Sequence, residues 1–136
     1  MTTPIAPHIT AFLREHLAVD RRASHHTCDT YAYAFRLLFD FMSRRFGVPP
    51  CELLLDQIDT PVVLEFLDHL QKDRRSAART RNARLAAIRA FMHFVEHRVP
   101  SALEQVRRVR AIPSQKTDTR LVRHLDAAEQ RALLDA

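Results

Sequence analysis

The side chains best suited to chemistry lie in one arginine-rich segment, residues 76–93. On a helical wheel of this segment, apolar side chains gather on one side, which we expect to face a core, and polar side chains gather on the other. The polar side comprises Arg79, Asn82, Arg89 and His93, with Ala86 and Ala90 between them. Arginine and asparagine hold phosphates and also bind guanine and adenine edges in the major groove of DNA. The pattern therefore indicates a surface for a polyanion, and the small alanines permit its close approach.

Further donors surround the start of this helix. A helix start offers free backbone N–H groups and a positive dipole, and both favour a bound phosphate. We expect Ser76 to cap the helix, Thr80 to lie in its first turn, and two more arginines, Arg81 and Arg84, to flank it.

The preceding long helix offers a parallel surface at its own start. Four small or switchable donors stand there: Ser24, His25, His26 and Thr27. Taken singly, Ser24 and Thr27 are also ordinary helix caps. The two helix starts together predict the nucleic-acid contacts of the chain.

The distribution of charge supports a polyanionic partner. The net charge is +5, yet residues 1–72 carry seven basic and nine acidic side chains. Residues 73–110 carry ten arginines against three acidic side chains, so this segment holds the whole positive excess. An all-helical protein-interaction module with a basic face for an acidic protein accounts for the same charge, and this alternative stays open.

The spacing of apolar residues predicts an all-α protein. One glycine in 136 residues disfavours hairpin-rich sheets and excludes Gly-rich phosphate loops. Gly47 stands where a helix ends, and Pro61 stands where one begins. We expect a compact bundle of four to five helices, over residues 7–19, 24–46, 61–72, 76–97 and 101–110. An extended linker, residues 112–123, and a last helix from Asp126 should follow.

Other classes of site find little support in the sequence. His25, His26, Cys28 and Asp29 are close in sequence, but neighbouring helical positions point in different directions, so we expect no metal site there. We expect no cofactor and no small-molecule substrate. Cys28 and Cys51 should be reduced. Apolar runs too short for a membrane span and the absence of a secretion signal predict a cytoplasmic protein.

Three motifs follow one another in a characteristic order. They are Ser24-x-x-Thr27-x3-Tyr31, Asp56-x-Ile58-x-Thr60, and Thr80-Arg81-Asn82-x-Arg84-Leu85-x-Ala87-Ile88-Arg89-x-Phe91. Their order and spacing resemble the second, third and fourth helices of the N-terminal core-binding, SAM-like domain of the tyrosine recombinases, the phage-integrase family. Residues 124–136 resemble the first helix of that family's catalytic domain. The resemblance covers nearly the whole chain.

The resemblance implies a DNA-binding domain of a site-specific recombinase. Residues 1–111 would bind duplex DNA at a recombination site through the starts of the second and fourth helices, beside other recombinase subunits. Residues 112–136 would be the linker and the truncated beginning of a catalytic domain.

The chain alone is not expected to be an enzyme. The family's nucleophilic tyrosine, paired arginines, catalytic lysine and His-x-x-Arg element belong to the second domain, and no His-x-x-Arg occurs in this sequence. The two tyrosines, Tyr31 and Tyr33, lie in the second helix. No nucleophile with an adjacent base is visible, which argues against independent catalysis.

Overall fold

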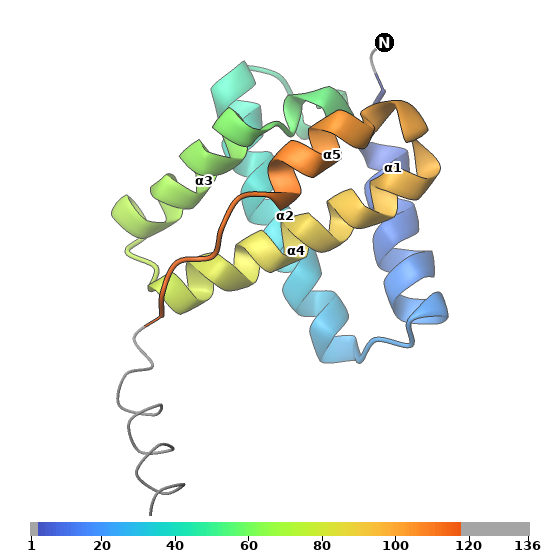
Figure 1. The fold of residues 1–136 in the computed structure, drawn as a ribbon, viewed down its shortest axis with the longest axis horizontal. Helices are drawn as coiled ribbons and strands as arrows, with labels where there is room; N and C mark the ends of the chain where they lie inside the picture. The colour runs from blue at the N-terminus through green and yellow to red at the C-terminus, as the bar shows by residue number, and fades with distance from the viewer. Residues whose placement is uncertain (1–2, 118–136) are drawn as a thin grey trace, which may run out of the picture.

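The computed structural model describes residues 3–117, and these residues form an all-helical body without a β-strand (Figure 1). The α-helices are α1 (Ala6–Ala11), α2 (His25–Phe46), α3 (Thr60–Lys72), α4 (Ala78–Arg98) and α5 (Leu103–Arg110). The all-α prediction is therefore confirmed. None of the described helices is long and apolar enough to cross a membrane. The predicted last helix from Asp126 lies outside the described residues.

Both ends of α2 follow from local chemistry. The Ser24 hydroxyl accepts a hydrogen bond from the backbone N–H of Thr27 at 3.0 Å, which satisfies a donor that the helix leaves free. At the other end Gly47 adopts φ 67°, a left-handed conformation that glycine tolerates without steric cost. The sequence predicted both ends correctly.

The start of α3 was also predicted, whereas the start of α4 was not. The Asp59 side chain accepts from the backbone N–H of Thr60 at 2.8 Å and caps α3. The expected capping of α4 by Ser76 is wrong, because the N-cap is Ala77, without a side-chain bond. The Ser76 backbone N–H instead donates to the Leu70 carbonyl at 2.8 Å, following Arg75 at φ 53°. Ser76 thus belongs to the turn that closes α3.

The first helix is less regular than its sequence predicted. The expected single α-helix over residues 7–19 becomes α1 followed by a π-helix, η1 (Phe12–Asp20). Its wider backbone pattern is visible in the bond from the Arg21 N–H to the His16 carbonyl, five residues back. Similarly, the fifth helix begins as a short 3₁₀ turn, η4 (Pro100–Ala102), before α5. Two further 3₁₀ turns, η2 (Pro50–Glu52) and η3 (Leu55–Gln57), connect α2 to α3.

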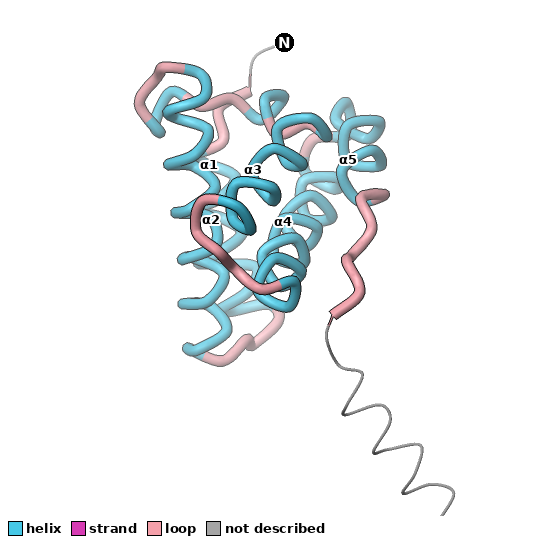
Figure 2. The backbone as a smooth tube through the Cα atoms, turned by 90° about the vertical axis from the view of Figure 1, so that its left-hand side faces the viewer, coloured by secondary structure: helices cyan, strands magenta, loops and turns pink. Residues whose placement is uncertain are grey.

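The central helix is α4, which contacts α2, α3 and α5 (Figures 1 and 2). Three phenylalanine rings join it to its neighbours: Phe91 lies 5.5 Å from Phe12 of η1 and 5.4 Å from Phe35 of α2, between ring centroids. The third pair, Phe12 and Phe35, is 6.0 Å apart, and all three pairs meet edge to face. This buried cluster fixes the crossing of α2 and α4, and with it the placement of both helix starts.

Candidate nucleic-acid interface

The starts of α2 and α4 lie on the same side of the molecule, in the lower half of both Figure 1 and Figure 2. At the start of α2, His25 and His26 are exposed. The Ser24 hydroxyl donates to the Thr27 hydroxyl at 2.9 Å while it caps the helix. Ser24 and Thr27 therefore have a structural role, and the two histidines are the most exposed side chains of this turn that could meet a ligand.

A tyrosine connects α2 with the region where α4 begins. The Arg84 guanidinium lies 5.1 Å from the centre of the Tyr33 ring, a cation–π contact, and Arg74 donates to the Tyr33 hydroxyl at 3.5 Å. Arg75 and Arg79 are exposed, and they lie between Arg74 and Arg84 in the sequence. We call Arg74, Arg75, Arg79 and Arg84 the basic cluster. It combines positive charge with an exposed aromatic ring, the combination that suits phosphates and bases.

The segment after α5 runs back along α4 toward its start (Figure 1). Residues 112–115 of this segment, which we call the docked linker, receive hydrogen bonds from three side chains of α4. Arg81 donates to the Pro113 carbonyl at 3.1 Å. Arg89 donates to the Ile112 carbonyl and, at 3.3 Å, to the Ser114 hydroxyl. The polar side of α4 is thus occupied by the chain itself.

Asn82 makes the most regular contact with the docked linker. Its Nδ2 donates to the Gln115 carbonyl at 2.7 Å, and the Gln115 backbone N–H donates to Asn82 Oδ1 at 2.9 Å. The Gln115 side chain also pairs with Gln71 of α3 through two bonds of 2.7 and 2.9 Å. Ile112 adds an apolar anchor, since it is buried in the core. The linker is therefore fixed to both α3 and α4.

Arg81 is buried, with 6% of its surface exposed. Burial, and secondly the nearby charge of Arg89, lower the pKa of the Arg81 guanidinium. Besides Pro113, this guanidinium donates to Asn82 Oδ1 at 3.2 Å, so it also positions the amide that holds Gln115. Its role in the described structure is to attach the linker.

The predicted exposed stripe on α4 is therefore only partly correct. Arg79 and His93 are exposed, as expected. The stripe is wrong for Asn82 and Arg89, which are half-buried beneath the docked linker. Arg81, which was expected to flank the helix start, is buried. Sequence reasoning missed this because it treated the segment after α5 as a free connector. Whether these three side chains also touch DNA stays a prediction, and it requires the linker to move aside.

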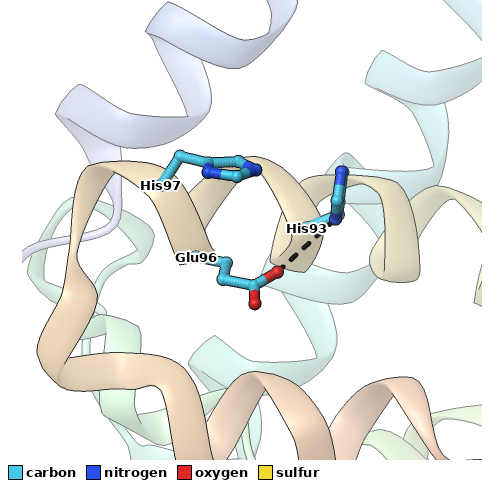
Figure 3. A group of neighbouring side chains, drawn as sticks. All are labelled: His93, Glu96 and His97. Atoms are coloured by element: carbon cyan, nitrogen blue, oxygen red, sulfur yellow. Dashed lines mark ion pairs between the residues drawn. The ribbon is translucent and has the colours of Figure 1, made fainter.

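One group of side chains in residues 3–117 brings three metal-ligand atoms together, and it is not the one considered from the sequence. His93, Glu96 and His97 offer ligand atoms within 4.8 Å of one another (Figure 3). His25 pairs with Asp29 at 3.8 Å, but no third ligand joins them among the described residues. Cys28 is half-buried and Cys51 exposed, and both are free thiols.

Comparison with known proteins decides the family. Residues 9–99 match the family model described as phage integrase, N-terminal SAM-like domain. The chain belongs to this family. The family predicted from the order of the three motifs is thereby confirmed. The match includes both helix starts and the whole basic cluster, and it ends before the docked linker.

Two relatives of this phage-integrase domain come from Sinorhizobium fredii and carry the name integrase/recombinase. The protein y4rC is 38% identical over 132 residues, which cover 97% of this chain and 40% of the relative. The protein y4rD is 36% identical over 132 residues, which cover 97% of this chain and 47% of the relative. The chain thus spans less than half the length of either relative. No solved structure matches it significantly.

Proposed function

We propose that this chain is the DNA-binding part of a site-specific recombinase and that it holds duplex DNA on the side where α2 and α4 begin. The observation that carries the proposal is the basic cluster at the start of α4, within a domain of the phage-integrase family. Exposed arginines there can neutralise phosphates, and the neighbouring turn of α2 adds His25 and His26.

Within this proposal the candidate residues divide by position. Arg79 and Arg84 contact the duplex directly, with Thr80 in the same first turns of α4. Ser24 and Thr27 stabilise the first turn of α2, whose other backbone N–H groups would face a phosphate, as helix starts do. A second set, Arg81, Asn82 and Arg89, holds the docked linker and meets DNA only when the linker leaves.

The proposal assigns binding, and not bond breakage, to this chain. Residues 1–111 form the DNA-binding domain, and residues 112–136 are the linker and the beginning of the domain that carries the catalytic groups. Tyr33 is held by two arginines in the described structure, and no base lies beside its hydroxyl there. Other recombinase subunits bound to the same site are the expected protein partners.

A matched pair of arginine variants tests the interface. Arg79→Ala removes one exposed charge from the basic cluster, whereas Arg107→Ala removes one exposed charge from α5. Duplexes that bind the original chain are first selected from a random-sequence library, and the affinity of each variant for them is measured by fluorescence anisotropy over a series of salt concentrations. We expect the logarithm of the affinity to fall linearly with the logarithm of the salt concentration. If Arg79 binds a base edge, its loss weakens binding by about 1–3 kcal/mol, and if it binds a phosphate, the salt slope falls by about 1.

The control defines the result that contradicts the proposal. Arg107→Ala should leave both the affinity and the salt slope close to those of the original chain, because α5 lies away from the two helix starts (Figure 1). Equal effects of the two substitutions would place the interface elsewhere. If heparin displaced the selected duplexes completely, the chain would be a general polyanion binder and not a site-specific DNA-binding domain. Tight binding of an acidic protein with no affinity for duplexes would favour an interaction module instead.

A further inference from the structure

The last turns of α4 carry a compact set of side chains that the proposed DNA contacts do not use. His93 Nδ1 lies 3.5 Å from Glu96 Oε2, and the rings of His93 and His97 are 5.2 Å apart between centroids, nearly perpendicular. Figure 3 shows the three side chains on neighbouring turns of the helix, with the Glu96 carboxylate paired to the His93 ring and the His97 ring on the other side. We call His93, Glu96 and His97 the triad.

We propose that the triad binds a divalent zinc ion. His93 precedes Glu96 by three residues and His97 by four, so it shares a helix face with each of them. Glu96 and His97 are consecutive, yet their ligand atoms still come within 4.8 Å of each other and of His93. Two imidazoles and one carboxylate, with a fourth position open to water, form a ligand set that zinc uses in proteins. Zinc–ligand bonds of about 2.0–2.1 Å place two tetrahedral ligands about 3.3 Å apart, close to the 3.5 Å between His93 and Glu96.

The remaining gap is small enough for side-chain rotation to close. One ligand atom from each residue of the triad lies within 4.8 Å of the other two. His93 and His97 are both exposed, which leaves their rings room to turn. Glu96 is more enclosed, with 29% of its side chain exposed, and its carboxylate already lies within reach of the His93 ring. The carboxylate is thus the fixed ligand and the imidazoles are the mobile ones.

The electrostatic surroundings favour a cation at this end of α4. The triad occupies the last two turns of the helix, where the dipole is negative. The neighbouring arginines are directed elsewhere: Arg89 bonds to the docked linker, and Arg98 lies over the Phe94 ring at 5.3 Å and donates to His8. One competitor remains, Arg110 of α5, whose Nη1 lies 3.7 Å from Glu96 Oε2.

The competition from Arg110 gives the proposal a distinctive consequence. Zinc binding takes the Glu96 carboxylate from Arg110 and thereby breaks an ion pair between α4 and α5. Removal of the arginine side chain should therefore strengthen zinc binding. A surface histidine pair that captured metal without Glu96 would keep its zinc affinity in Glu96→Gln.

The experiment uses the full chain without an affinity tag. Zinc chloride is titrated by calorimetry, and cobalt chloride is titrated in parallel because its visible spectrum reports tetrahedral coordination. We expect one ion per chain for the original sequence, at least about tenfold weaker binding for His93→Ala and for His97→Ala, and weaker binding for Glu96→Gln. Arg110→Gln should bind more tightly than the original chain. Circular dichroism of each variant confirms that the helices are retained.

A matched control removes two other exposed histidines. The double substitution His25→Ala and His26→Ala should leave zinc affinity and the cobalt spectrum unchanged, because these residues lie at the start of α2. Zinc affinity retained in His93→Ala and His97→Ala, or lost in the double control, would overturn the proposal, as would an Arg110→Gln variant that binds no better. The titrations contain no DNA, so their outcome is independent of the proposed DNA interface.

Discussion

Replacing Asn82 with alanine should release the docked linker from α4 while the helices stay folded. Asn82 exchanges two hydrogen bonds with the backbone of Gln115, at 2.7 and 2.9 Å. A protein hydrogen bond contributes about 0.5–1.5 kcal/mol net, so the pair could contribute about 1–3 kcal/mol. Because Asn82 is half-buried and Gln115 is exposed, water partly replaces the lost partners. We therefore expect about 1–2 kcal/mol, which is about a 5- to 30-fold increase in linker opening.

Amide hydrogen exchange at Gln115 measures this opening directly. The Gln115 N–H donates to Asn82 Oδ1 and is protected only while the linker is docked. Its exchange should accelerate in Asn82→Ala by the factor given above, whereas the amide of Leu85, inside α4, should change little. Asn82→Asp keeps the acceptor and loses the donor, so its Gln115 exchange rate should lie between those of the original chain and of Asn82→Ala. Gln115 exchange at the rate of an open chain in the original protein, or an unchanged rate in Asn82→Ala, would refute the reasoning.

Three further substitutions test the fold. Leu85→Ala removes a fully buried side chain of α4 and should lower the free energy of unfolding by about 2–5 kcal/mol, measured by urea denaturation. Gly47→Ala should cost about 1 kcal/mol in the same assay, purely from its φ of 67°, since nothing lies within 4 Å of an added Cβ. Burial, and secondly the Arg98 charge, lower the pKa of His8 in the folded state. In the unfolded chain His8 therefore binds a proton at about pH 6.5, whereas in the folded chain it binds one only at lower pH. The free energy of unfolding should fall as the pH decreases below that value. His8→Gln should reduce this acid-dependent loss, and an unchanged pH profile would contradict the account.

The elements that the sequence predicted well are those with local causes. Ser24 and Gly47 delimit α2 through bonds and backbone angles that involve only their immediate neighbours. Asp59 and Pro61 set the start of α3 for the same kind of reason. The π-helix after α1 gave no comparable signal, because its wider turn does not change which residues are apolar. Ser76 matches the local pattern for a helix cap, but its backbone N–H donates to the Leu70 carbonyl, which places it in the turn after α3, and α4 begins after Ala77.

The candidate site was predicted less well, because long-range contacts decide which face of α4 is free. The sequence alone could have indicated the burial of Arg81, which precedes Leu85 by four residues and Ile88 by seven and so lies on the apolar stripe. The docking of residues 112–115 has no such periodic signal. The His93-x-x-Glu96-His97 spacing is visible in the sequence, but the helical wheel also places His93 on the polar stripe expected to face DNA.

The docked linker also limits how far the rest of the chain can travel. Its four residues are held against α4, and the chain leaves the described part beside the first turns of that helix (Figure 1). An extended chain spans at most about 3.3–3.6 Å per residue, so release of residues 112–115 would lengthen the flexible tether after α5 by about 13 Å. A longer tether lowers the effective concentration of an attached group at a nearby binding site, and it brings more distant binding sites within reach. Arg81, Asn82 and Arg89 of α4 thus control the length of this tether, because they hold residues 112–115 in place.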